Sequence, residues 1–230
     1  MVILALDTAG ENCAVALAKA GDGKSLLARR SETIGRGHAE RLMPMIGEVL
    51  AEASLTYADL ERIAVATGPG SFTGTRIGVA AARGLALALG IPAVGVSVLD
   101  ALIEAAGAES DRLIVAALDA RRGEIYAKAV TPGSDTAVLE AQVTTVAALA
   151  QAIEGLNGEP VTLTGSAAAE IARMLGQAGI SANVAGEAAS ADISTIAALA
   201  AFGDSHSPPV PLYLRPPDAK PQTGMAVARK

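Results

Sequence analysis

The sequence has little of the chemistry on which most catalytic and nucleic-acid-binding proteins depend. Tryptophan is absent, aromatic residues make up 2% of the 230 residues, and there are two histidines and one cysteine. The single cysteine, Cys13, cannot form an internal disulfide. With a net charge of −6, the chain also lacks the basic excess expected of a protein that grips RNA by itself. We therefore expect the chain to contact nucleic acid only through a partner protein.

Long uninterrupted apolar runs are missing as well. The start, MVILALD, has no basic residues and reaches a carboxylate at Asp7, which argues against a signal peptide. The apolar stretch over residues 77–103 is interrupted by Arg83, Pro92 and Asp100, so it does not predict a membrane span. These features predict a cytoplasmic protein without membrane attachment. What is abundant is hydrophobic residues, at 51%, which suits sheets covered by helices.

The order of the predicted elements indicates an α/β fold in two halves. Strands are predicted at residues 2–6, 13–19, 25–33, 62–66, 92–96, 113–118, 124–130 and 161–163, and helices at 38–53, 75–89, 99–108, 145–155, 167–178 and 193–202. Pro44 should kink the first helix or confine its regular part to the residues that follow. Three hairpin-linked strands followed by alternating helices and strands are typical of ribonuclease-H-like folds.

The most informative segment is GPGSFTGTRIG, residues 68–78, which lies between a predicted strand and a long predicted helix. Gly68 and Gly70 let the main chain approach a ligand or another backbone closely. A strand, a turn and a helix in this order can present backbone N–H groups to an anion. A tight turn in which Ser71 or Thr73 caps the helix explains the same residues. The spacing alone leaves both interpretations open.

Six segments together resemble one protein family. They are LALDTA at 4–9, HAERLMPMI at 38–46, GPGSFTGTRIG at 68–78, GLAL at 84–87, LDARRGEIY at 118–126 and PLYLR at 211–215. In this order they are similar to the TsaB (YeaZ) family, the glycoprotease-like, non-catalytic paralogues of TsaD in bacterial tRNA threonylcarbamoyladenosine modification.

The resemblance implies an actin-like fold with two tandem subdomains, each a mixed sheet flanked by helices. Residues 1–104 would form the first subdomain and carry the partner-binding helices. Residues 105–204 would form a smaller second subdomain, whose last helix could pack back on the first. Residues 205–230 would be a proline-rich tail, extended or disordered.

The resemblance also implies a function. The chain would be a scaffold or activating subunit that docks TsaD, in the complex that adds a threonylcarbamoyl group to N6 of adenosine 37 in tRNAs decoding ANN codons. The ATPase TsaE and the tRNA would be met through the complex, and the chain would form a homodimer when alone. The isolated chain would need no cofactor, while the interface with the partner leaves a place for ADP or ATP.

A degenerate nucleotide site is a second expectation. In the actin-like superfamily, a metal-coordinating carboxylate and a phosphate turn stand where Asp7 and Thr8 follow the first strand. Ala9 and Glu11 replace the donors that a polyphosphate would meet, and a carboxylate repels phosphate. Turn capping by Asp7 explains the residue equally well. The candidate nucleotide-binding residues are Asp7, Thr8, Gly68, Gly70 and Asp119.

Asp119, in turn, is either part of a second phosphate turn or the start of a charged hairpin tip with Arg121 and Arg122. An alternative function follows from the two carboxylates. The chain would then be a Mg-dependent nucleotide phosphohydrolase or phosphotransferase of the actin-like superfamily, using Asp7 and Asp119.

The sequence has no motif that predicts a metal site or a peptidase. The TsaD paralogue carries Gly-Val-Asn-His-x-x-x-His after the matching strand, whereas this chain has GVSVLDAL at residues 95–102. Val98 and Leu102 stand at the histidine positions and cannot bind a metal. His38 and His206 lie in unrelated segments, and no His-Glu-x-x-His or Gly-x-Ser-x-Gly motif is present. We predict no metal site and no catalytic residue.

Two helices of the first half are predicted to bind a partner. The predicted helix at 38–53 has an apolar stripe too broad for a helix that faces only one neighbour, so it is either enclosed or covered by a partner. The predicted helix at 75–89 has small residues at every fourth position, which lets a second helix approach closely. The partner-binding candidates are Leu42, Met45, Ile46, Val49, Arg76, Gly78, Val79, Ala82, Arg83 and Ala86.

Overall fold

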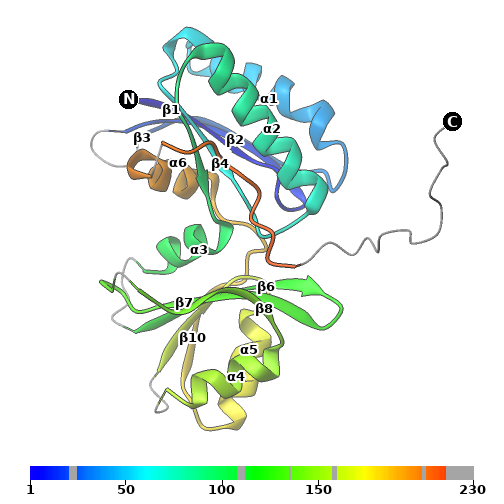
Figure 1. Ribbon diagram of the computed structural model, residues 1–230, viewed down its shortest axis with the longest axis vertical. Coiled ribbons are helices and arrows are strands. Elements are labelled where there is room, and N and C mark those ends of the chain that lie inside the picture. Colours follow the sequence, from blue (N-terminus) through cyan, green and yellow to red (C-terminus); the bar gives the residue numbers. More distant parts are fainter. Residues whose placement is uncertain (21–24, 108–111, 135, 157–159, 204–205, 216–230) are drawn as a thin grey trace, which may run out of the picture.

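The computed structural model describes residues 1–20, 25–107, 112–134, 136–156, 160–203 and 206–215. They form two five-stranded sheets, one above the other in Figure 1, with strand orders β3-β2-β1-β4-β5 and β10-β9-β6-β7-β8. The first half comprises β1 (Val2–Asp7), β2 (Asn12–Lys19), β3 (Ser25–Thr33), α1 (His38–Glu52), the 3₁₀ turn η1 (Tyr57–Asp59), β4 (Arg62–Ala66), α2 (Phe72–Leu89), β5 (Ala93–Val96) and α3 (Val98–Gly107). The second comprises β6 (Leu113–Arg121), β7 (Glu124–Val130), β8 (Ala137–Thr144), α4 (Val146–Glu154), β9 (Val161–Thr164), α5 (Ala168–Gln177), β10 (Ala182–Gly186) and α6 (Ile193–Phe202).

The two sheets repeat one topology. In each sheet, three antiparallel strands are followed by two strands parallel to the first. In the first sheet β4 pairs with β1 and β5 pairs with β4; in the second, β9 pairs with β6 and β10 pairs with β9. A mixed sheet with this order, flanked by helices, is the actin-like α/β fold predicted from the sequence. The duplication is one of fold, since the sequence shows no repeat of fixed period.

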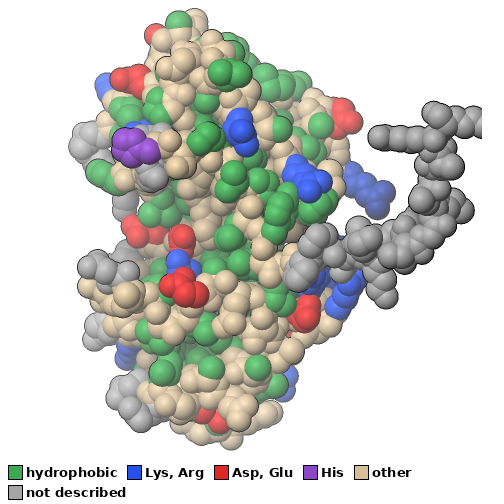
Figure 2. Space-filling model, viewed as in Figure 1, with side chains coloured by type: hydrophobic (Ala, Val, Ile, Leu, Met, Phe, Trp, Pro, Cys, Tyr) green, Lys and Arg blue, Asp and Glu red, His purple; other side chains and the backbone are tan. Residues whose placement is uncertain are grey.

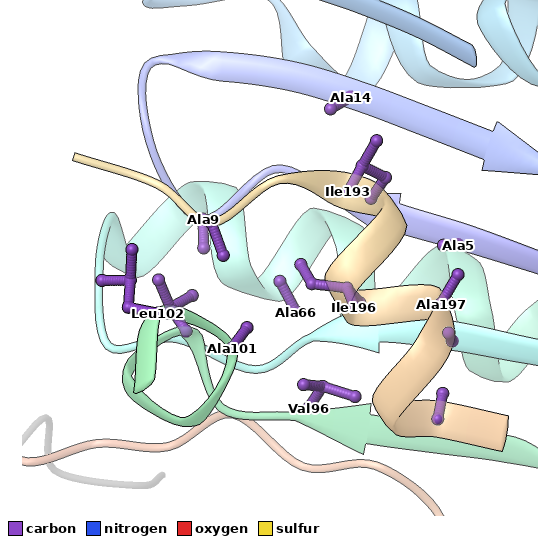
Figure 3. Close-up of a cluster of buried hydrophobic side chains, with 14 of the residues drawn as sticks. Ala5, Ala9, Ala14, Ala66, Val96, Ala101, Leu102, Ile193, Ile196 and Ala197 are labelled. Carbon is purple, nitrogen blue, oxygen red and sulfur yellow. The ribbon is translucent and has the colours of Figure 1, made fainter. Parts of the chain in front are cut away.

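Helices cover both faces of the first sheet. Helices α1 and α2 pack on one face, and α6, although last in the sequence, packs on the other against β1, β2, β4 and β5. Figure 3 shows Ile193 and Ile196 of α6 facing alanines of this sheet, among them Ala14 and Ala66. With α3, which also packs against β6, they form a hydrophobic cluster shared by both halves. The small alanine side chains allow α6 to lie close to the strands.

Several sequence-based predictions need correction. Strands β8 and β10 were not predicted, because neither contains a buried residue and their apolar runs are short. Helix α1 runs uninterrupted through Pro44. Pro44 lies on the exposed side of α1, as does Glu40, whose carbonyl loses its helical partner there and can bond to water.

The apolar stretch at 77–103 is divided among α2, β5 and α3, and none of the helices in the described ranges could cross a membrane.

The proline-rich segment predicted as a tail is a structural element in its described part, residues 206–215, which we call the strap. It is extended but not free. The Leu212 N–H donates to the Thr67 carbonyl at 2.8 Å, and Leu214 packs against the cluster shared by both halves. Arg215 donates to the Ala120 carbonyl at 3.1 Å and forms an ion pair with Glu124. The strap therefore joins the first half to the β6–β7 hairpin of the second; residues 216–230 lie outside the described ranges.

The packing of α6 on the first sheet makes a prediction for two residues of one helix. Ile196 is fully buried in the shared cluster, whereas Phe202 is 93% exposed. Replacing Ile196 with Ala should lower the free energy of unfolding by about 2–4 kcal/mol, because a cavity forms. Phe202→Ala should change it by less than about 0.5 kcal/mol. Urea denaturation measures both, and equal losses would mean that α6 does not pack in this way.

Candidate functional site

The turn that follows β1 packs directly on the start of α2. The Thr8 hydroxyl donates to the Gly74 carbonyl at 2.7 Å, and the Ser71 N–H donates to the Ala9 carbonyl at 2.6 Å. The Ser71 side chain accepts from the Gly74 N–H at 3.2 Å and caps the helix. Protein groups therefore occupy the N–H groups of Ser71 and Gly74.

The glycines of the segment make this close contact physically feasible. A Cβ on Gly70 would lie 2.2 Å from the Ala9 carbonyl oxygen, and one on Gly74 would lie 2.0 Å from the Thr8 carbonyl oxygen. No side chain fits at such distances, so only glycine allows the two backbones to meet. Of the two interpretations that the spacing left open, the structure has the capped turn with backbone against backbone.

Asp7 is enclosed beneath this contact. Its side chain is 2% exposed, and its Oδ1 accepts from the Ala9 N–H at 2.8 Å. Burial raises the pKa of Asp7 to about 6, although the Ala9 hydrogen bond and the charge of His38 oppose the rise. His38, at the first position of α1, is also buried, and its Nε2 has no hydrogen-bond partner among the described residues. This is the geometry of a turn-capping carboxylate, and it gives no support to a metal at Asp7.

Asp119 lies in a different setting, exposed near the end of β6. Its carboxylate accepts from the Arg121 N–H at 2.7 Å, and its own N–H donates to the Ser166 hydroxyl at 3.0 Å. A cavity of about 390 Å³ opens beside it and is lined by the carboxylates of Asp119, Glu124 and Glu170. Glu124 is paired with Arg215, but the carboxylates of Asp119 and Glu170 would repel a polyphosphate. Nucleotide binding by Asp7, Thr8, Gly68, Gly70 and Asp119 stays a prediction that this arrangement does not favour.

Most of the predicted partner-binding residues are inside the molecule. They lie between the first sheet and the two helices, so partner binding by these residues stays a prediction that their burial does not favour. The sequence pattern identified the apolar stripes but not their direction. The enclosed residues are Leu42, Met45, Ile46, Val49, Gly78, Val79 and Ala82. Arg76 and Arg83 are exposed, and Ala86 is half-buried.

The opposite sides of the same helices are exposed, and we call them the outer face of α1 and α2. Leu87 is 86% exposed, and Met43 is exposed as well. A Cβ on Gly47 or Gly84 would meet no atom of the described residues within 4 Å, so no described part of the chain covers these positions. Figure 2 shows hydrophobic and basic side chains side by side over this part of the upper half. The outer face consists of Met43, Gly47, Ala51, Ala80, Arg83, Gly84 and Leu87.

Within the described ranges, no cluster of three or more His, Cys, Asp or Glu side chains could hold a metal ion. Val98 and Leu102, which stand at the paralogue's histidine positions, are both buried in the cluster shared by the two halves. These positions serve packing in this chain.

Comparison with known proteins agrees with the fold. The family model of tRNA N6-adenosine threonylcarbamoyltransferase (TsaD) matches residues 31–204. An uncharacterized protein of Mycobacterium tuberculosis strain H37Rv is 35% identical over 221 residues, 95% of this chain and 94% of that one. The tRNA threonylcarbamoyladenosine biosynthesis protein TsaB of Escherichia coli is 40% identical over 127 residues, 55% of this chain and 53% of that one. The match therefore spans about half the length of that relative.

Two solved structures extend the comparison. YeaZ from Pseudomonas aeruginosa superposes with a TM-score of 0.66 and 29% identity, covering 88% of this chain and 92% of that one. The ROK hexokinase of Thermus thermophilus superposes with a TM-score of 0.53 and 15% identity, covering 88% and 98%. The second likeness shows the fold alone.

The contact between Gly74 and Thr8 predicts opposite effects for two glycines of one helix. Gly74→Ala should lower the free energy of unfolding by about 3 kcal/mol, because the new methyl group would force the two backbones apart. Gly84→Ala, at an open position of α2, should raise it by about 0.5–1 kcal/mol through helix propensity. Urea denaturation of both variants tests this, and a stable Gly74→Ala protein would contradict the contact.

The raised pKa of Asp7 predicts a pH dependence of stability. The unfolded chain releases this proton near pH 3.8 and the folded chain near pH 6. Between these values the folded state binds more protons, so the free energy of unfolding falls as pH rises, by about 3 kcal/mol in all. Asp7→Asn keeps an acceptor for Ala9 but does not titrate. The variant should therefore gain about 3 kcal/mol relative to wild type between about pH 4 and pH 7. A difference that does not vary with pH would contradict this account.

Proposed function

We propose a function for this chain from its family: it belongs to the TsaB (YeaZ) branch of the tRNA N6-adenosine threonylcarbamoyltransferase proteins. The chain acts in the cytoplasm as a non-catalytic subunit in the synthesis of threonylcarbamoyladenosine in tRNA. It docks TsaD and so supports transfer of the threonylcarbamoyl group to N6 of adenosine 37 in tRNAs that decode ANN codons. TsaE joins through the complex.

The observation that carries the proposal is the outer face of α1 and α2. It combines an uncovered leucine, Leu87, with glycines at Gly47 and Gly84 that offer no side chain. Small residues allow another helix to approach closely, and exposed apolar side chains gain free energy when a partner covers them. In the absence of TsaD, the same face is available to a second copy, which gives an isologous homodimer.

The two carboxylates support a binding role over the alternative of a Mg-dependent nucleotide phosphohydrolase or phosphotransferase. Asp7 is enclosed and bonded to its own turn, and Asp119 is bonded to its own hairpin. A catalytic carboxylate must reach the reacting group or its metal. A nucleotide, ADP or ATP, is then more readily held at the interface with TsaD than by this chain alone.

Docking is tested at Leu87, because its side chain is exposed and a charge there leaves the fold intact. Leu87→Glu would place a carboxylate in a desolvated interface, which is costly without a partner charge. We expect at least about a tenfold loss of TsaD retained in a pull-down and a matching loss of labelled threonine incorporated into tRNA by the reconstituted proteins. The thermal unfolding temperature should be unchanged.

The matched control is Phe202→Glu, which puts the same charge at an exposed apolar residue of α6, away from the outer face. It should leave both TsaD retention and threonine incorporation at the wild-type level. A charge at Ala82 is unsuitable, because that side chain is buried and the variant would unfold. If the Leu87→Glu protein retains as much TsaD as the wild type, the proposed docking face is wrong.

A further inference from the structure

The start of α2 and the strap together expose two aromatic rings side by side. Phe72 and Tyr213 are 51% and 49% exposed, and their ring centroids are 5.4 Å apart. They lie far apart in the sequence, and the strap brings them together. Exposed rings held next to each other offer flat apolar area that water solvates poorly.

Arg76 fixes the geometry of this pair. Its guanidinium carbon lies 3.6 Å from the Phe72 ring centroid and 5.6 Å from that of Tyr213. Its Nε donates to the Tyr213 hydroxyl at 2.7 Å. The two rings and the guanidinium plane are therefore held in place before any partner arrives, which lowers the entropy cost of binding.

Three arginines of this region have no carboxylate partner among the described residues. Arg76, Arg83 and Arg121 form no ion pair within the described ranges, whereas arginines elsewhere, such as Arg30 and Arg41, are paired with carboxylates. Arg121 lies at the tip of the β6–β7 hairpin, in the left-handed conformation with a φ of 63°. Of the nearby carboxylates, Glu124 pairs with Arg215, whereas Asp119 accepts only from the Arg121 backbone and keeps its negative charge.

The strap places this hairpin close to the rings. Arg215 donates to the Ala120 carbonyl, next to Arg121, and Tyr213 lies two residues earlier in the extended strap. Figure 2 shows Lys and Arg side chains along the right-hand side of both halves. A protein with a net charge of −6 thus has a local positive edge next to exposed rings.

We propose that this edge, formed by Phe72, Arg76, Arg121 and Tyr213, contacts a single-stranded or looped segment of RNA. Bases would stack on the rings and the guanidinium plane, and phosphates would lie against the arginines. The choice of RNA over an acidic protein surface follows from the combination of stacking area with cations and rests on the proposed function, in which RNA is the substrate. The contact is one part of RNA binding by the complex.

The test measures binding of a fluorescein-labelled RNA stem-loop to the isolated full-length chain by anisotropy, between about 50 and 200 mM salt. Tyr213→Leu should weaken binding about tenfold, because it removes one stacking surface. Arg121→Gln should weaken binding and reduce the slope of log affinity against log salt by about 0.7. Arg173→Gln, which removes an exposed cation from α5, should change neither quantity.

A second measurement does not depend on variants that fold. A 4-thiouridine in the RNA loop, crosslinked to the wild-type chain and mapped by mass spectrometry, should mark the strap or the start of α2. The inference is overturned by absence of saturable binding, by crosslinks confined to other elements, or by an Arg173→Gln effect equal to that of Arg121→Gln. It is also overturned if Tyr213→Leu keeps RNA affinity but loses TsaD, since the edge then belongs to the docking face. Leu87→Glu should keep RNA affinity, which separates this outcome from failure of the proposed function.

Discussion

The contact of the turn after β1 with the first turn of α2 is the constraint on which the other features depend. Because the Gly74 backbone lies against the Thr8 carbonyl, α2 is held close to the first sheet, and residues such as Val79 and Ala82 sink into the core. The side of α2 with Ala80, Arg83 and Leu87 is then left outward. The same contact therefore fills part of the space beside the turn and sets which side of the helix faces outward.

In the function proposed here, an actin-like fold serves binding without a change of topology. The actin-like strand order is kept, while Asp7 is buried under its own turn, at a cost in stability near neutral pH. A nucleotide-binding version would need that turn open and the helix N–H groups free. Here the Ser71 N–H donates to the Ala9 carbonyl and the Thr8 hydroxyl donates to the Gly74 carbonyl, so protein groups fill this space. What the fold offers to other molecules is its outer surface.

The sequence predicted the order of most strands and helices because these segments have strong periodicity and clear turns. Strands β8 and β10 lacked that signal, since exposed strands need few apolar residues. An apolar stripe such as that of α1 has the same sequence pattern whether a sheet or a partner covers it. The sequence therefore could not predict that this stripe faces the core. The contacts of the strap with Thr67, Arg76 and Ala120 are long-range and leave no local pattern. Net charge, being an average, concealed the positive edge.

One rigid helix connects the two surfaces proposed for this chain. Helix α2 has 18 residues, about 27 Å in length, with Phe72 at its first turn and Leu87 at its last. A partner seated near Leu87 and an RNA segment near Phe72 would be held at a fixed distance and orientation. Correct placement of two reactants can supply a large part of a rate enhancement without any catalytic side chain. In the function proposed here, a subunit without a catalytic side chain still matters to the reaction, because its structure decides where the catalytic partner and the substrate meet.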